Sequence, residues 1–184
     1  FVMTRASYAG GQRYAATWAG DNSATWNHLR QTIPQLENLG LSGFAMAGAD
    51  VGGFAGSPQA QLLTRWLELA AFQPIDRDHT SKGTNPQEPW QDGTAADLAL
   101  RRKYIGERYY LMPYLYTTAK TMSETGLPMM RPLFMEFPYG EKDGQPLDLA
   151  DSGAFMLGPD LLIAESPYPD EVDDYSVALP PVGW

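Results

Sequence analysis

The sequence contains no cysteine and only two histidines among its 184 residues. The lack of cysteine excludes disulfides, thiolate metal sites and a cysteine nucleophile. The histidines fit no HExxH pattern and no segment has EF-hand spacing, so neither a zinc nor a calcium site is expected. GxGxxG, GxxxxGK[ST] and GxSxG are absent as well. The sequence therefore predicts a protein with no metal and no cofactor.

Basic residues are few, since 13 Lys and Arg stand against 22 Asp and Glu, a net charge of -9. No basic stripe is available to neutralise nucleic acid or an anionic membrane surface, so neither is expected as a partner. No apolar run approaches the roughly 20 residues that cross a bilayer, and the amino end lacks a signal-peptide pattern. We expect a soluble chain that binds neutral or cationic small molecules. Its compartment and oligomeric state stay open.

Hydrophobic residues make up 43% of the chain, which suffices for a packed core. The chain opens in an apolar, strand-like run, FVMTRA, and closes at PPVGW with no polar tail. We therefore expect the sequence to be part of a longer polypeptide.

The first 90 residues alternate between short apolar segments, glycine-rich loops and amphipathic helices. Buried strands are expected at residues 1–5, within 41–57 and within 70–81. Between them, apolar residues at helical spacing predict two helices. The first helix follows three candidate caps, Asp21, Asn22 and Ser23. Pro34 bends it and Gly40 ends it. The second helix has Ser57 as its cap and Pro58 in its first turn.

This alternation is the rhythm of an α/β protein with a parallel sheet. The longer connections fall on the strand-to-helix side, where Asp21, Asp50, Arg77 and His79 all lie. That asymmetry fits a (β/α) barrel whose active site is at the carboxyl ends of the strands. An open doubly wound sheet has the same rhythm.

The second half changes in character after one long helix. Thr94 and Asp97 form a capping box that opens this helix, which runs to about Thr125 with a kink at Pro113. Short apolar runs separated by Gly, Pro and Asp follow, and they predict a β-sheet domain. We therefore divide the chain into an α/β domain at 1–125 and the start of a β domain at 126–184. The acidic run PDEVDDY, residues 169–175, is expected to be a solvated turn.

Asp21 is the first candidate for chemistry, although it can equally well cap the following helix. Capping does not explain the neighbouring Tyr14 and Trp18, which we place on a glycine-rich loop with no core to join. Aromatic rings beside carboxylates suit a sugar, since the rings cover its apolar C–H face and the acids bind its hydroxyls.

Two further candidates occupy the same phase of the repeat. Asp50 follows a buried strand and precedes two glycines, although it can also be a turn aspartate that bonds its own backbone. His79 ends the run DRDH, whose charges can alternatively form only a surface network. The barrel interpretation brings Asp21, Asp50 and His79 to one rim. His28, within the first helix, is expected to be a solvated or packing residue.

Four blocks, taken together, resemble glycoside hydrolase family 31, a family of retaining α-glucosidases. They are GQRYAATWAGDN at 11–22 with Arg5 before it, GADVGGF at 48–54, RDH at 77–79 and RPLFMEFP at 131–138. The blocks keep the family's order and approximate spacing across the chain. The resemblance implies the C-terminal part of a (β/α)8 TIM barrel followed by the beginning of an all-β sandwich domain.

The resemblance also implies roles for individual residues. Asp21 would be the general acid/base of a double-displacement mechanism. Arg5 and His79 would bind sugar hydroxyls, Trp18 and Phe54 would line the subsite, and Asp50 and Arg77 would support these groups. Asp78 stands where the family commonly has Asn. The family's nucleophile belongs to a W-x-D-M-N-E type block, which this sequence lacks and which we expect upstream of Phe1.

The expected function is therefore hydrolysis of α-glucosidic bonds in oligosaccharides, with the rest of the same barrel as the partner that completes the site. Residues 1–184 alone are expected to be inactive. Two alternatives stay open at this point. An α-xylosidase or α-glucosyltransferase would share these motifs, and an inactive sugar-binding or scaffold protein would keep the barrel without the nucleophile.

Overall fold

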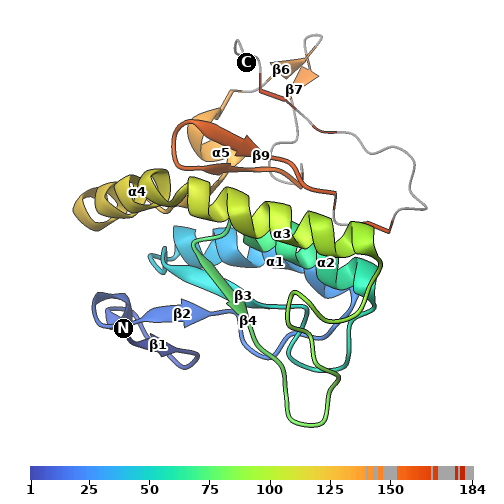
Figure 1. Ribbon diagram of the computed structural model, residues 1–184. Coiled ribbons are helices and arrows are strands. Elements are labelled where there is room, and N and C mark those ends of the chain that lie inside the picture. The colour runs from blue at the N-terminus through green and yellow to red at the C-terminus, as the bar shows by residue number, and fades with distance from the viewer. Residues whose placement is uncertain are drawn as a thin grey trace.

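The structure is a computed structural model that describes residues 1–139, 141–142, 145–146, 153–166, 168–169, 177 and 179–180. A parallel sheet and an antiparallel sheet lie on opposite sides of a layer of helices (Figure 1). Of the acidic run at 169–175 that was predicted to be a solvated turn, residues 170–175 lie outside the described residues.

The parallel sheet is formed by successive strands of the chain. Its strands are β1 (Met3–Thr4), β2 (Ala16–Trp18), β3 (Ala47–Val51) and β4 (Ile75–Asp78). They pair in the order β1-β2-β3-β4, each one parallel to the next. A doubly wound sheet reverses its strand order at a switch point, whereas a barrel keeps chain order. The observed order therefore selects the barrel.

Two of these strands differ from the prediction. The expected buried strand at 1–5 is only β1, half-buried at the edge of the sheet, and Phe1 is exposed. β2 was not predicted, because its glycine-rich surroundings resemble a loop. Trp18 consequently ends a strand instead of lying on a loop. Tyr14 precedes the same strand and is exposed, so it does not accompany Trp18 at the carboxyl end.

Helix α1 (Trp26–Leu41) begins later than predicted. Its N-cap is Thr25, whose hydroxyl accepts from the His28 N–H, rather than any of the three residues at 21–23. The reason is that the backbone just before the helix pairs with another loop: the Ala24 N–H donates to the Ala55 carbonyl at 2.8 Å. The helix contains Pro34, as predicted, and it passes Gly40 to end at Leu41.

Helix α2 (Ala60–Ala70) also begins later than expected, with Gln59 at the N-cap position. Ser57 does not cap it, because the Ser57 hydroxyl accepts from the Asn85 N–H at 2.9 Å. The predicted apolar face of α2 is confirmed. Leu62, Trp66 and Leu69 are buried there, in one hydrophobic core with residues of α1 and β3.

The long helix expected up to Thr125 is two helices, α3 (Ala95–Tyr110) and α4 (Met112–Thr125). The capping box of Thr94 and Asp97 is present, as predicted. Pro113 lies in the first turn of α4, where a proline fits because its missing N–H is not needed. The predicted kink is therefore a helix break at Leu111.

After Gly126 the chain forms an antiparallel sheet from β5 (Met130–Pro132), β8 (Phe155–Leu157) and β9 (Leu161–Ile163), in the order β5-β8-β9. The segment between β5 and β8 contains a short helix that was not predicted, α5 (Leu133–Glu136), and the strand pair β6 (Glu141–Lys142) and β7 (Gln145–Pro146). Phe155 and Leu157 join the same core as Leu29 and Trp66. Helix α1 packs against both β3 and β5, so the two sheets share one hydrophobic layer.

Candidate active site

Asp21 lies in the loop that follows the carboxyl end of β2. It comes after Gly20, whose φ of 90° glycine adopts without strain. The Asp21 carboxylate is 2.9 Å from the guanidinium of Arg5, which follows β1, and both side chains are about half exposed. Since Thr25 caps the helix, Asp21 is not needed as a cap. Its carboxylate is therefore open to a ligand.

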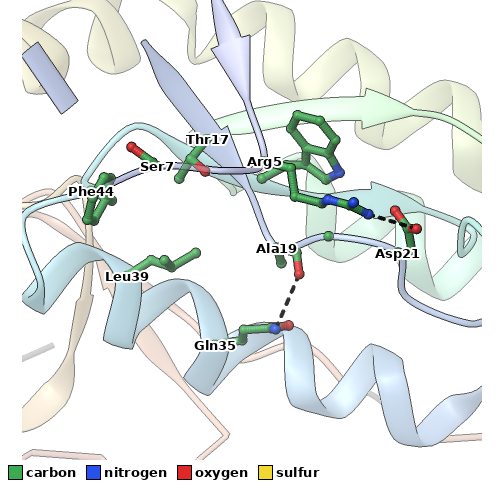
Figure 2. Close-up of a pocket in the computed structure, with 10 residues that line it drawn as sticks. Arg5, Ser7, Thr17, Ala19, Asp21, Gln35, Leu39 and Phe44 are labelled. Carbon is green, nitrogen blue, oxygen red and sulfur yellow. Dashed lines mark hydrogen bonds and ion pairs between the residues drawn. The ribbon is translucent and has the colours of Figure 1, made fainter. Parts of the chain in front are cut away.

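A pocket of about 520 Å³ opens beside this ion pair (Figure 2). Arg5 and Asp21 lie at one end of it, and Leu39 and Phe44 at the other. The connection from β1 to β2, all of which is described, contains one short 3-10 helix, η1 (Gly11–Arg13), in place of an α-helix. The pocket is lined by residues of this connection, of β2 and of α1.

Asp50, Arg77 and Trp18 form a second group on neighbouring strands. Asp50 lies within β3 rather than after it, is fully buried, and forms an ion pair with Arg77 of β4. The Arg77 guanidinium also lies 4.7 Å from the centroid of the Trp18 ring. Burial raises the pKa of Asp50, while the hydrogen bond and charge of Arg77 oppose that rise. Among the described residues, nothing hydrogen-bonds the second carboxylate oxygen of Asp50.

Phe54 and His79 meet at the ends of β3 and β4. Their ring centroids are 5.4 Å apart and the planes are inclined by 26°, which is a stacked arrangement. Phe54 is half-buried and His79 is exposed, so the pair presents an aromatic surface. The charges of His79 and Asp21 both act on Asp50, which puts the three predicted residues around one region.

The charged run at the end of β4 divides between the two faces of the strand. Arg77 points toward Asp50, whereas Asp76 faces α3 and lies 3.8 Å from Arg108. The pKa of Asp78 is raised to about 6, chiefly by desolvation, although the residue is exposed on one side. A hydrogen bond from Gln87 opposes that rise. Asp76 and Arg108 are thus structural, and Asp78 belongs to the loops of the site.

Two buried amide side chains hold these loops, and the sequence analysis assigned neither to the site. Asn22 was considered only as a helix cap. Its Nδ2 donates to the Asp50 carbonyl at 3.0 Å, and its Oδ1 accepts from the Phe54 N–H at 2.8 Å. Gln87 forms a comparable link between the loops after β3 and β4. The position of Asn22 next to Asp21 was the available signal; Gln87 lies in a segment without any periodic pattern.

His28 supports the Asp21 loop from inside α1. Its Nδ1 accepts from the Ser23 N–H at 3.0 Å, and the residue is half-buried; it was predicted to be a solvated or packing residue. Within the described ranges, no group of three or more His, Asp or Glu residues is arranged to hold a metal ion. In the same ranges, none of the helices is long and apolar enough to cross a membrane.

Comparison with known proteins identifies the family. Residues 1–118 match the family described as "Glycosyl hydrolases family 31 TIM-barrel domain", which is more than half of the chain. The chain belongs to glycoside hydrolase family 31. This confirms the resemblance seen in the sequence blocks, and the parallel strands are part of the family's barrel.

Several family 31 proteins are similar to the chain. A probable glucan 1,3-alpha-glucosidase of Oryza sativa is 46% identical over 180 residues, which are 98% of this chain and 19% of the rice protein. Alpha-glucosidase 2 of Bacillus thermoamyloliquefaciens is 46% identical over 164 residues, 89% of this chain and 20% of that protein.

Solved structures of the family agree. The Tris-bound glucosidase II alpha subunit superposes with a TM-score of 0.83 at 36% identity, over 92% of this chain and 18% of that one. The family 31 alpha-glucosidase of Bacteroides thetaiotaomicron superposes with a TM-score of 0.80 at 41% identity, over 90% of this chain and 27% of that one. The chain therefore spans about a fifth to a quarter of the length of these relatives.

Proposed function

We propose that the chain supplies the acid/base side of a retaining α-glucosidase active site. The observation that carries this proposal is the Asp21 carboxylate, which lies just after the carboxyl end of β2 and is held by Arg5, just after β1. This is the side on which barrel enzymes bind substrates. Relatives named as α-glucosidases support the assignment of substrate.

In this proposal Asp21 protonates the departing glycosidic oxygen and later takes a proton from water. Arg5 and His79 bind sugar hydroxyls, and Trp18 and Phe54 line the subsite. Asp50 and Arg77 are supporting residues. Two observations favour this division: Asp50 has no exposed surface and is paired with Arg77, whereas Asp21 is half exposed.

A retaining mechanism needs a second carboxylate about 5 to 5.5 Å from the first, which attacks the anomeric carbon. Asp50 is fully buried and paired with Arg77, so it is not free to attack. We propose that the nucleophile comes from another part of the complete polypeptide. Residues 1–184 alone would then not hydrolyse α-glucosides.

We propose that other strands of the same barrel are the partner that completes the fold. In the described part of the chain, β1 and β4 each pair on one side only, and a closed barrel leaves no such edge. We also retain the predicted division into a barrel segment at 1–125 and the start of a β-sandwich domain at 126–184. The change from parallel to antiparallel pairing after Gly126 supports it.

The test is Asp21→Asn in the complete polypeptide, assayed on maltose and on aryl α-glucosides with activated leaving groups. We expect kcat/KM on maltose to fall about 10²- to 10⁴-fold, because that leaving group needs a proton. The activated substrates should lose much less. Glu124→Gln, on the exposed surface of α4, is the matched control and should leave both activities unchanged. An equal loss on both substrate classes would contradict the acid/base role.

A further inference from the structure

Gln87 lies in the long connection after β4 and is 2% exposed. Its side-chain Nε2 lies within hydrogen-bonding distance of four oxygens. These are the carbonyls of Val51 at 2.8 Å, Gly53 at 3.3 Å and His79 at 3.2 Å, and a carboxylate oxygen of Asp78 at 3.2 Å. Since the amide has two N–H groups, the four acceptors share two donors.

These four acceptors belong to two different loops. Val51 and Gly53 end β3 and begin its loop, whereas Asp78 and His79 do the same for β4. One buried side chain therefore joins the carboxyl ends of two adjacent strands. The close approach of the Gln87 side chain to the loop after β3 depends on glycine, because a Cβ on Gly52 would lie 3.0 Å from the Gln87 amide nitrogen.

The two stacked rings, Phe54 and His79, are attached next to these contacts. The Gly53 carbonyl immediately precedes Phe54, and the His79 carbonyl belongs to the ring-bearing residue itself. Phe54 has a second tether, since its N–H donates to Asn22. The loop that carries His79 is bonded to Gln87 through the His79 carbonyl and directly to Phe54, since the Ser81 N–H donates to the Phe54 carbonyl at 2.9 Å. Gln87 and this direct bond therefore both contribute to the separation of the two rings.

We propose that Gln87 is a positioning residue for substrate binding, which sets the Phe54–His79 surface by joining the loops that carry the two rings. This rests on the proposed function, in which both rings contact the sugar. Gln87 itself does not contact substrate, because it is buried behind the loops. Its effect reaches the sugar through His79 and Phe54.

The chemistry of the contact requires a donor at this position. Four oxygens surround Nε2, whereas Oε1 has no hydrogen-bond partner in the described structure. A methionine would keep the volume and remove both N–H groups. An ionised glutamate would place negative charge against three carbonyls and Asp78, but a protonated glutamate would donate one hydrogen bond.

The first test is Gln87→Met in the complete polypeptide, assayed well below its unfolding temperature. We expect KM for maltose and the inhibition constant of glucose to rise about 10- to 100-fold, because small displacements of binding groups have effects of this size. The ratio of rates on activated and poor leaving groups should stay as in the wild type, since Asp21 is untouched. Gln59→Met, at the exposed start of α2, is the matched control and should bind normally.

A double-mutant cycle with His79→Ala tests the route of the effect. If Gln87 acts through His79, the double variant should bind glucose little more weakly than His79→Ala alone. Folded Gln87→Met with wild-type KM, or fully additive losses in the cycle, would overturn the proposal. A wild-type polypeptide that does not hydrolyse α-glucosides would instead refute the proposed function, so the two failures are distinguishable.

Gln87→Glu keeps the proposal testable if the methionine variant does not fold. Its KM relative to wild type should be highest above pH 7, where the carboxylate is ionised, and should approach the wild-type value as the pH is lowered toward 5. A ratio that does not change with pH would refute the need for a donor at this position.

Discussion

Arg77 joins two of the predicted site residues, because its guanidinium pairs with buried Asp50 and lies over the Trp18 ring. The cation-π contact and the ion pair fix the planar guanidinium from two directions. At the scale of single residues, the site is thus built on a charge pair whose carboxylate is fully buried. Such a pair is costly to break, since one buried charge then stays unpaired.

Arg77→Met should therefore destabilise the protein by about 3 kcal/mol at pH 8, a value at the low end for buried pairs because Arg77 is partly exposed. The loss should be smaller at pH 5. Burial already raises the pKa of Asp50, and without Arg77 the carboxyl takes up a proton more readily as the pH falls. Urea unfolding at the two pH values measures this. Arg77→Met combined with Asp50→Leu should recover most of the loss, and no recovery would contradict the paired-charge explanation.

Single residues were also where sequence reasoning was most informative about placement. Asp21, Asp50 and His79 were predicted to share one rim because they occupy the same phase of a repeat, and the structure brings them together. Their contacts were not predictable. Pairing and burial depend on which strands become neighbours, and a single sequence does not state that.

At the scale of elements, the loops after β2 and β3 owe their shape to the close approach of their backbones. Gly53 has a φ of 95°, and a Cβ there would lie 2.4 Å from the backbone nitrogen of Ala24. The Ala24 N–H is itself bonded to Ala55. The loops after β2 and β3 are therefore packed backbone to backbone, which only a residue without a side chain permits.

Gly53→Ala should consequently cost more than backbone strain alone. Gly83→Ala is a matched comparison, because Gly83 also has a positive φ, of 90°, but a Cβ there would meet nothing within 4 Å. We expect a loss of about 1 kcal/mol for Gly83→Ala and of about 3 kcal/mol or more for Gly53→Ala. Thermal unfolding of the two variants measures the difference. Equal losses would show that the contact with Ala24 is unimportant.

Helix boundaries show what local sequence can and cannot determine. The capping box of Thr94 and Asp97 was predicted correctly, because it needs only residues three positions apart. Three other boundaries were wrong. The starts of α1 and α2 were displaced because the residues before them bond to distant loops, at Ala55 and Asn85. The sequence predicted one helix with a kink at Pro113, whereas the structure has two helices, α3 and α4, separated at Leu111.

At the scale of the whole molecule, α1 lies between the two sheets and carries a buried acid. Glu37 is 7% exposed, and burial raises its pKa to about 8. The folded protein therefore holds a proton that the unfolded chain releases above about pH 4.5. By linkage, the free energy of unfolding falls as the pH rises from about 4.5 to about 8.

Glu37→Gln removes this titration without changing the size of the side chain. The variant should be as stable as wild type near pH 5 and more stable by about 2–4 kcal/mol at pH 9, since one pKa unit corresponds to about 1.4 kcal/mol. Denaturant unfolding between these pH values measures the difference. Burial also raises the pKa of Glu165, to about 7, so the wild-type profile contains both groups and only the difference isolates Glu37. A constant difference across the range would contradict the prediction.

The order of strands in the sheet has a consequence for how the chain folds during synthesis. β1, β2, β3 and β4 each pair with the strand that precedes or follows them in the chain. Each of β2, β3 and β4 therefore finds a neighbour already made when it leaves the ribosome. The loop contacts of Asn22 and Gln87 follow the same sequence, from β2 to β3 and then from β3 to β4. Translation thus delivers the loops at the carboxyl ends of these strands in the order in which their contacts depend on one another.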